Sequence, residues 1–284
     1  MRVLIAYDGS ESADEACDLV ATIDWPRGSE LRVVTAYAPY LPGELEPVEL
    51  FDPATPVVAF EAEREAAEDS AGNAASRLGR PGITVTSTAI MGRPSSVILD
   101  EAAAAAADLL VTGCRGMGPI TSALLGSVSA EIVDHAACPV LVARRSTVDR
   151  VVLADDGSAG ARTAAALLAW PIFAGSRVRV VTVAAAIPLT PEGDLVEAVL
   201  DKAEAVAVEA AAQLRTAGLT AEADVRAGDP AHQIVRSAVD WDADLVVMGT
   251  RGRTGPDRHL LGSVTRKVLA HATCSVLVAR SPAR

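Results

Sequence analysis

A glycine-rich loop occurs twice in this chain with the same internal spacing, and this repeat constrains the fold more than any other feature. In the first copy, Gly113–Gly116 (Gly-Cys-Arg-Gly) is followed by the pair Gly126-Ser127. The second copy has Gly249–Gly252 (Gly-Thr-Arg-Gly), followed by Gly262-Ser263. Each loop follows an apolar run that suits a strand and precedes a segment that suits a helix. The chain therefore contains two copies of one structural unit.

The remainder of the chain also aligns with itself. Asp8 corresponds to Asp156 with an offset of 148 residues, whereas Gly92 corresponds to Gly228 with an offset of 136. The first copy therefore holds 12 extra residues between Asp8 and Gly92. A short polar stretch separates the copies, and each copy has the size of an ordinary domain. The two predicted domains comprise residues 1–145 and 149–281.

Each copy alternates apolar runs with alanine-rich helical segments. The apolar runs lack a polar/apolar alternation, which is typical of strands covered on both faces. Because parallel neighbours need long, right-handed connections, the alternation predicts an α/β fold. We expect two tandem Rossmann-like, doubly wound domains, each a five-stranded parallel sheet flanked by helices. The strands predicted in the first copy are Val3–Tyr7, Leu31–Tyr37, Ile83–Ile90, Leu109–Thr112 and Val140–Ala143.

Several helix ends are marked in the sequence. Ser12 and Glu15 have the spacing of a capping box, which predicts a helix beginning at Ser12. Pro94 and Pro230 suit the first turn of a helix in each copy, because proline needs no hydrogen-bond partner there.

Composition limits the classes of partner. The chain has 284 residues and a net charge of −12, which argues against nucleic-acid binding because phosphates require a basic surface. No apolar run reaches the roughly 18 residues that span a bilayer. The first residues suit a strand and do not form a secretory signal. We therefore expect a cytoplasmic protein with no membrane partner.

The acidic excess is concentrated in the first copy. Nine acidic residues and one basic residue lie between Glu44 and Asp69, a stretch that contains the 12-residue insertion. This stretch is either a solvated surface or a docking surface or lid over a ligand site.

The four cysteines show no metal-binding or disulfide pattern. Cys138 and Cys274 occupy equivalent positions before the last strand, where buried structural thiols are expected. Cys114 lies inside the first glycine loop and is either a small loop residue or a redox sensor. No metal ligands are predicted.

The glycine loops favour a nucleotide phosphate as ligand. Glycines after a parallel strand let backbone N–H groups approach an anion, and the N-terminus of a following helix attracts negative charge. Ser127 and Ser263 can cap those helices and donate a hydroxyl to phosphate. Arg115 and Arg251 either add positive charge there or serve as solvated or inter-domain residues.

Two further pairs of residues would complete such a site. Asp8 and Asp156 follow the first strand of each copy, where a carboxylate can accept a hydrogen bond from an adenine amino group or a ribose hydroxyl. The alternative for both is an Asx turn or a helix cap. Ala36 and Val183 fall near the end of the second strand, where a small apolar side chain can contact a base.

The Gly-x2-Gly-x9-Gly-Ser pattern, with Asp8 or Asp156 after the first strand, resembles the ATP-binding branch of the universal stress protein family. The resemblance covers nearly the whole chain and identifies it as a tandem, two-domain member. It implies a stress-response role, an unidentified protein partner, and ATP with Mg²⁺ carried by the nucleotide. It also implies that the last strands pair across a two-fold axis, within one chain or in a homodimer. The nucleotide-binding residues that the resemblance implies are Asp8, Ala36, Gly113, Gly116, Gly126, Ser127, Asp156, Val183, Gly249, Gly252, Gly262 and Ser263. Arg115 and Arg251, selected for their charge, complete the predicted set.

No catalytic constellation is evident in the sequence. A GxSxG elbow and a GxxxxGK[ST] loop are absent, and the chain has only two lysines, Lys202 and Lys267. Efficient phosphoryl transfer places a cation on the transferred group. We therefore expect an ATP-binding regulatory protein with two nucleotide sites and little or no catalysis. The alternatives are a slow ATPase and a structural stress protein that binds no nucleotide.

Overall fold

A computed structural model describes residues 1–38, 55–115, 125–184, 193–250 and 261–280 of the chain. Each half contains five strands and four α-helices within these residues, in the alternating order expected from the sequence. The first half comprises β1 (Arg2–Ala6), α1 (Glu11–Thr22), β2 (Glu30–Tyr37), α2 (Thr55–Leu78), β3 (Thr84–Met91), α3 (Pro94–Ala104), β4 (Leu109–Gly113), α4 (Ser127–His135) and β5 (Val140–Ala143). The second half comprises β6 (Arg150–Ala154), α5 (Ala159–Leu167), the 3-10 helix η2 (Pro171–Phe173), β7 (Arg177–Ala184), α6 (Gly193–Thr216), β8 (Thr220–Ala227), α7 (Pro230–Asp240), β9 (Leu245–Gly249), α8 (Ser263–His271) and β10 (Ser275–Ala279).

The ten strands form one continuous sheet, in the order β3-β2-β1-β4-β5-β10-β9-β6-β7-β8. Within each half all strand pairs are parallel, which confirms the predicted fold class. The halves join where β5 and β10 run antiparallel, with Leu141 opposite Leu277. Each of these two strands also has a parallel neighbour on its other side. The alternative in which the last strands pair within one chain is therefore confirmed. Neither strand has a free edge for a second chain in this arrangement, and a homodimer stays a prediction.

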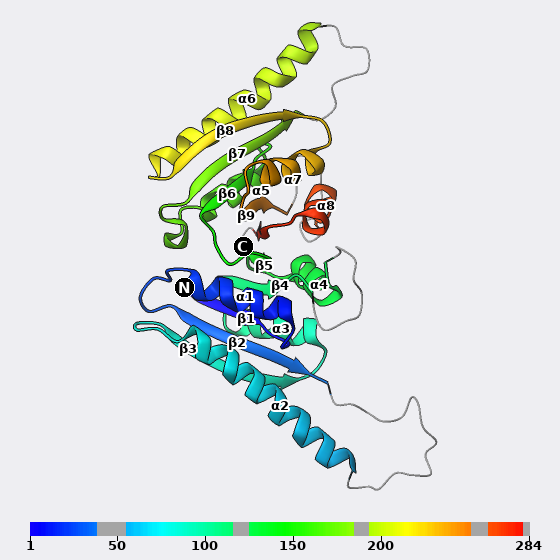
Figure 1. The fold of residues 1–284 in the computed structure, drawn as a ribbon. Coiled ribbons are helices and arrows are strands. Elements are labelled where there is room, and N and C mark those ends of the chain that lie inside the picture. The colour runs from blue at the N-terminus through cyan, green and yellow to red at the C-terminus, as the bar shows by residue number, and fades with distance from the viewer. Residues whose placement is uncertain (39–54, 116–124, 185–192, 251–260, 281–284) are drawn as a thin grey trace, which may run out of the picture.

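Helices cover both faces of the sheet (Figure 1). The side chains of Val3 and Ile5 pack into a core layer beneath α1, α2, α5 and α6, whereas Leu4 packs into a second layer beneath α3, α4, α7 and α8. Both layers contain buried residues from both halves, including residues of β5 and β10. The two halves are thus joined by continuous apolar packing as well as by a strand pair.

Burial is uneven across the sheet. Every residue of the central strands β4 and β9 is buried, as expected for strands covered on both faces. In β3 and β8 most residues are only partly buried or exposed, so the expectation of full cover is wrong for the third strand of each half. Both strands lie at an edge of the sheet, where fewer helices reach them.

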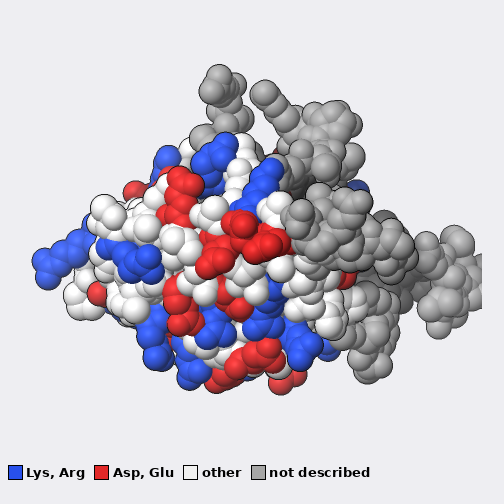
Figure 2. All heavy atoms as spheres, turned by 90° about the horizontal axis from the view of Figure 1, so that it is seen from above, with Lys and Arg blue, Asp and Glu red and all other residues white. Residues whose placement is uncertain are grey.

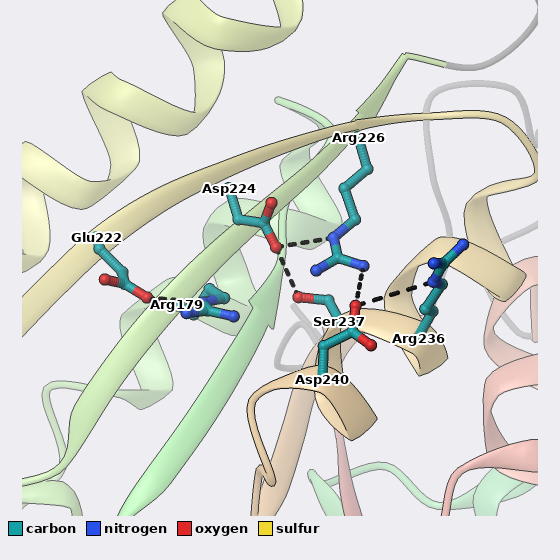
Figure 3. Close-up of polar contacts among 7 residues, drawn as sticks. All are labelled: Arg179, Glu222, Asp224, Arg226, Arg236, Ser237 and Asp240. Carbon is teal, nitrogen blue, oxygen red and sulfur yellow. Dashed lines mark hydrogen bonds and ion pairs between the residues drawn. The ribbon is translucent and has the colours of Figure 1, made fainter.

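An ion-pair network covers one face of the edge strand β8 (Figure 3). The Arg226 guanidinium pairs with Asp224 at 2.8 Å and with Asp240 at 2.9 Å, and the Ser237 hydroxyl donates to Asp224 at 2.7 Å. On β7, Arg179 pairs with Glu222 at 2.6 Å and lies 4.6 Å from the centroid of the Trp241 ring. These contacts let charged residues pack between the edge strand and α7.

Two helix starts were predicted correctly and one was not. Pro94 and Pro230 are the first residues of α3 and α7, as predicted. The cap of α1 is Ser10 and not Ser12, because the Ser10 hydroxyl accepts from the Ala13 N–H. Its counterpart Ser158 caps α5 in the same way. The predicted cap position was therefore wrong by two residues.

Charged residues of opposite sign are mixed on the surface. On the face drawn in Figure 2, the Lys and Arg side chains lie among Asp and Glu side chains and form no continuous basic area in the part described. Among the described residues, no helix combines the length and apolar character needed to cross a bilayer.

Candidate functional site

The strand order creates a switch point in each half. In the first half β1 lies between β2 and β4, and the helices next to these strands leave toward opposite faces of the sheet. In the second half β6 lies between β7 and β9 in the same way. Ligands of doubly wound folds bind in the crevice at the carboxyl ends of such strands. Several of the residues selected from the sequence lie at these two positions.

Asp8 and Asp156 lie just after β1 and β6. The Oδ1 atom of Asp8 accepts a hydrogen bond from the Ser10 N–H at 3.1 Å, and Asp156 Oδ1 accepts from the Ser158 N–H at 3.0 Å. The Asx-turn alternative is therefore confirmed for both residues. Asp8 is exposed and Asp156 is partly exposed. A carboxylate has about four acceptor positions, so the turn leaves each side chain capacity to accept a further donor.

Gly113 and Gly249 end the central strands β4 and β9, and their lack of a side chain has a packing role that the sequence did not indicate. A Cβ atom on Gly113 would lie 2.5 Å from the carbonyl oxygen of Ser12 in α1. A Cβ atom on Gly249 would lie 2.6 Å from the carbonyl carbon of Gly160 in α5. Glycine at both positions therefore lets the first turn of a helix lie directly against the strand end.

The glycine that ends each loop is the N-cap of the following helix. Gly126 and Gly262 are the N-caps of α4 and α8, and both have extended backbone angles. Ser127 and Ser263 are thus the first helical residues, so the prediction that they cap these helices was wrong. The N–H groups of a helix's first turn have no partner inside the helix, which makes this end suited to an anion.

One backbone hydrogen bond joins the two ends of each glycine loop. The Gly126 N–H donates to the carbonyl of Cys114 at 2.8 Å, and the Gly262 N–H donates to the carbonyl of Thr250 at 2.7 Å. This contact places the start of α4 or α8 beside the end of the central strand. It accounts for the identical spacing between the first glycine of the loop and the glycine at the helix start in the two copies. The predicted site residues Gly116, Arg251 and Gly252 lie outside the residues that the structure describes.

A hydroxyl residue in each copy was missed by the sequence analysis. The Ser129 hydroxyl donates to the Gly113 carbonyl at 2.8 Å, and the Thr265 hydroxyl donates to the Gly249 carbonyl at 3.0 Å. Both side chains are buried in the first turn of the helix that follows the loop. The two positions align in the repeat and both carry a hydroxyl. This shared hydroxyl is the sequence signal that could have identified them. These bonds fix the helix N-terminus relative to the strand.

Ala36 and Val183 lie near the carboxyl ends of β2 and β7. Both are half-buried and pack against the core layer beneath α3, α4, α7 and α8. They therefore lie on the same face of the sheet as the helix N-termini of the glycine loops. Arg115 is exposed, and its side chain lines a pocket between α1 and the end of α8. This position agrees with the inter-domain alternative for Arg115.

A buried carboxylate next to the second switch point was also missed. Asp155 corresponds to Tyr7 in the repeat, is 7% exposed, and accepts from the Gly157 N–H at 2.7 Å. Burial raises the pKa of Asp155 above its ordinary value, and the neighbouring Asp156 raises it further, although the Gly157 N–H opposes both effects. The two halves therefore differ in charge beside equivalent strand ends.

The fold and the repeated strand order define a class of tandem α/β protein with two equivalent switch points. The sequence profile of the universal stress protein family matches residues 1–144 and 147–280. The chain belongs to the universal stress protein family and contains two copies of its domain. This finding confirms the resemblance to the family and the tandem architecture inferred from the repeat.

Relatives support the same assignment. A universal stress protein of Thermus aquaticus is 37% identical over 143 residues, which cover 50% of this chain and 97% of the relative. A universal stress protein of Mycolicibacterium smegmatis is 31% identical over 191 residues, or 63% of each chain. The solved structure of a universal stress protein from Archaeoglobus fulgidus has a TM-score of 0.69 and 19% identity, and the match covers 98% of both chains. This structural match supports the two-domain fold.

Proposed function

We propose that the protein is an ATP-binding regulator of a stress response, with one nucleotide site in each half and little or no catalysis. The main observation is that equivalent elements converge at both switch points: an Asx-turn carboxylate, the end of a central strand and a helix N-terminus. The proposed domain bounds remain 1–145 and 149–281, and each domain contributes one site.

Each proposed site has a base end and a phosphate end. The free acceptor positions of Asp8 and Asp156 suit an adenine amino group or a ribose hydroxyl. The half-buried Ala36 and Val183 supply small apolar contacts for the base. The helix N-termini at Ser127 and Ser263 suit phosphate, because their N–H groups and the helix dipole favour negative charge.

The complete set of proposed binding residues is unchanged from the sequence analysis, including Gly116, Arg251 and Gly252. Gly113 and Gly249 contribute through the shape of the strand end rather than through contact alone. Mg²⁺ would enter with the nucleotide and supply charge neutralisation for its phosphates.

The regulatory role is favoured over the slow ATPase by the positions of the lysines. Lys267 Nζ lies 3.3 Å from Asp229 Oδ2 in a surface ion pair, and Lys202 lies on α6, on the opposite face of the sheet from α8. Neither is placed on a helix N-terminus of a glycine loop, where a transferred phosphoryl group would be stabilised. A structural stress protein that binds no nucleotide is the remaining alternative.

Calorimetric titration of the nucleotide-free full chain with Mg-ATP tests this proposal. We expect close to two ATP molecules per chain. The variants Gly126→Glu and Gly262→Glu place a negative side chain at each helix cap, and each should reduce the stoichiometry to about one. The backbone tolerates both changes, because φ is −61° at Gly126 and −67° at Gly262.

Gly72→Glu is the matched control. It introduces the same side chain in α2, where a Cβ atom would have no neighbour within 4 Å. This variant should keep the full stoichiometry. If wild-type protein bound no ATP at millimolar concentrations, the nucleotide proposal would be wrong and the structural alternative favoured. Repeated release of phosphate from the bound ATP would favour the slow ATPase.

A further inference from the structure

The two edges of the sheet are formed by equivalent strands of the repeat, β3 and β8 (Figure 1). Three charged residues lie at alternate positions of β8: Glu222, Asp224 and Arg226. The corresponding positions of β3 hold uncharged residues: Thr86, Thr88 and Ile90. The other residues of β3 are uncharged as well. Charges on an edge strand oppose pairing with a further strand, so β8 is protected against such pairing and β3 is not.

The charges of β8 are fixed by side chains of neighbouring elements (Figure 3). Glu222 pairs with Arg179 of β7 at 2.6 Å, and Arg226 pairs with Asp240 of α7 at 2.9 Å. A strand added at β8 would lie beside these charged groups and remove water from them, which is costly. The equivalent positions of β3 carry no charge, so a further strand meets no such cost there.

The outer side of β3 presents a row of backbone groups. The Thr84 N–H donates to the carbonyl of Ser29, on the β2 side, at 3.0 Å. Backbone groups of successive strand residues point to opposite sides, so Thr84 and every second residue after it face β2. The N–H and C=O groups of the remaining residues face away from β2: Val85, Ser87, Ala89 and Met91. No strand in the described part of the chain pairs with this outer side, so an extended chain can add to it.

The two faces of β3 offer different contacts to an added strand. Val85 packs against the core layer beneath α2, so the small side chains of Ser87 and Ala89 lie on that face. Ile90 packs against the layer beneath α3, so Thr88 lies on that opposite face. Beneath α2 there is room for long side chains, whereas the other face suits β-branched residues as cross-strand neighbours.

The helix α2 places an acidic stripe beside this open edge. Arg77 of α2 pairs with Asp14 and Asp18 of α1, so the flank of α2 that carries Arg77 faces α1. The opposite flank lies toward the β3 edge and carries exposed acidic side chains at helical spacing: Glu61, Glu65 and Glu68. Glu68 also pairs with Arg64 at 2.7 Å, and the stripe keeps a net negative charge. Positive side chains of an added strand would complement it.

The second half supplies a natural comparison. The residues of α6 that correspond to the acidic stripe are also acidic: Glu197, Asp201 and Glu204. The two halves therefore differ in the edge strand itself rather than in the sign of the helix beside it. Only β3 combines an uncharged edge with the acidic flank.

We propose that β3 is a docking edge for an extended segment of a partner protein in which basic residues alternate with β-branched residues. The backbone of the segment continues the sheet by pairing with the outward groups of β3. Its basic side chains lie beside the acidic stripe, and its β-branched side chains lie on the opposite face beside Thr86, Thr88 and Ile90. A second copy of this chain fits less well, because two acidic stripes would then flank the same strand pair. The docking edge is independent of nucleotide binding.

Fluorescence anisotropy of the full chain with a labelled, terminally blocked peptide, Lys-Val-Lys-Thr-Lys-Val-Lys, tests the proposal. We expect saturable binding of one peptide per chain that weakens as salt is added, because salt screens the acidic stripe. The same peptide with N-methylated backbone amides keeps its charge but cannot donate to β3. It should bind more than about tenfold more weakly, since several hydrogen bonds are lost.

Variants locate the binding edge. Ser87→Pro removes one outward N–H and leaves the pairing with β2 intact, which is the position where an edge strand tolerates proline. It should weaken peptide binding about three- to tenfold, as expected for one hydrogen bond. Ala223→Pro is the matched change in β8 and should leave the affinity unchanged. Glu61→Gln with Glu65→Gln should also weaken binding, whereas Glu197→Gln with Asp201→Asn in α6 should not. Circular dichroism checks that each variant is folded.

Three results would overturn the proposal. The first is no binding of the peptide at millimolar concentration. The second is equal binding of the N-methylated and unmodified peptides, or equal binding by Ser87→Pro and Ala223→Pro, since attraction would then come from charge alone. The third is a wild-type dimer in sedimentation that Ser87→Pro abolishes, because the edge would then serve a second copy. Titration with ATP has no bearing on any of these results.

Discussion

Arg144, at the end of the first half, donates a hydrogen bond from Nη2 to the carbonyl oxygen of Leu269, in α8 of the second half, at 2.6 Å. The repeat supplies the reciprocal contact. Arg280 donates to the carbonyls of Val133 and Asp134 in α4, and the second of these bonds is 2.8 Å long. Each arginine therefore binds the C-terminal end of a helix in the other half, where the helix dipole favours positive charge.

Arg144→Ala should weaken the connection between the halves. The change leaves the Leu269 carbonyl without its charged donor, which typically costs about 1.5–3 kcal/mol. Equilibrium urea unfolding measures the loss in the free energy of unfolding. Arg145→Ala is the neighbouring control, because its ion pair with Asp242 is exposed and 3.4 Å long. Exposed pairs contribute about 0–1 kcal/mol, so equal effects of the two variants would contradict a specific role for Arg144.

Gly113→Ala should destabilise the first half through steric overlap. The added Cβ atom would lie 2.5 Å from the Ser12 carbonyl oxygen and 2.6 Å from its carbonyl carbon, so α1 must move. Overpacking of this kind costs about 1–3 kcal/mol. The matched control is Gly72→Ala, within α2 and with open space around the new atom. That change should stabilise the protein by about 0.5–1 kcal/mol, because alanine favours helix. Thermal unfolding of both variants distinguishes overlap from backbone propensity.

Thr265→Val should loosen the start of α8. The substitution keeps the branched shape but removes the hydroxyl that donates to the Gly249 carbonyl at 3.0 Å. We expect a loss of about 1–3 kcal/mol, since a buried carbonyl then lacks a partner. Thr265→Ser retains the donor and should be less destabilising. Urea unfolding compares the two, and a larger loss for the serine variant would mean that the methyl group matters more than the hydrogen bond.

Asp155→Asn should increase stability at neutral pH. Because burial raises the folded-state pKa of Asp155, its contribution to stability is fully present below the ordinary value of 3.8 and is lost as pH rises through the raised pKa. Asparagine keeps an acceptor for the Gly157 N–H without a desolvated charge. The advantage of the variant should therefore shrink as pH falls toward 3.8. Urea unfolding at a series of pH values measures this trend.

Asp229→Asn should show the opposite trend. The His232 N–H and then Lys267 hold the pKa of Asp229 below its ordinary value. Its stabilising contribution is therefore present above the unfolded-state pKa and is lost as pH falls through the folded-state pKa. The variant should be less stable than wild type near neutral pH and should approach it in acid. If both aspartate variants followed the same pH trend, the assigned environments would be wrong.

Much of the fold was predictable from the sequence because its signals are repeated. The predicted strands differ from the observed ones by no more than one residue at either end. The family resemblance also implied that Val140–Ala143 and its counterpart would pair, although the choice between one chain and two needed the structure. Hydrophobic runs reveal strands well, since burial on both faces removes polar residues from the sequence.

The details of the sites were harder to predict because they depend on contacts between distant segments. The packing role of Gly113 depends on the backbone of α1, which lies about a hundred residues earlier in the chain. The displaced cap of α1 has a local cause: both Ser10 and Ser12 are acceptable cap residues, and only the backbone decides between them. Exposure of β3 and β8 depended on their edge positions, which strand composition alone does not encode.

The antiparallel pairing of β5 with β10 has an evolutionary consequence. In a symmetric dimer every substitution appears twice, so both binding sites must change together. Here one polypeptide holds the two halves together at any protein concentration. A residue in one half can therefore be substituted without a change in its counterpart in the other half. Tyr7 and Asp155 already show this divergence: one equivalent position carries a phenol and the other a buried acid. A single chain can therefore specialise its two halves for different ligands or different conditions without losing their association.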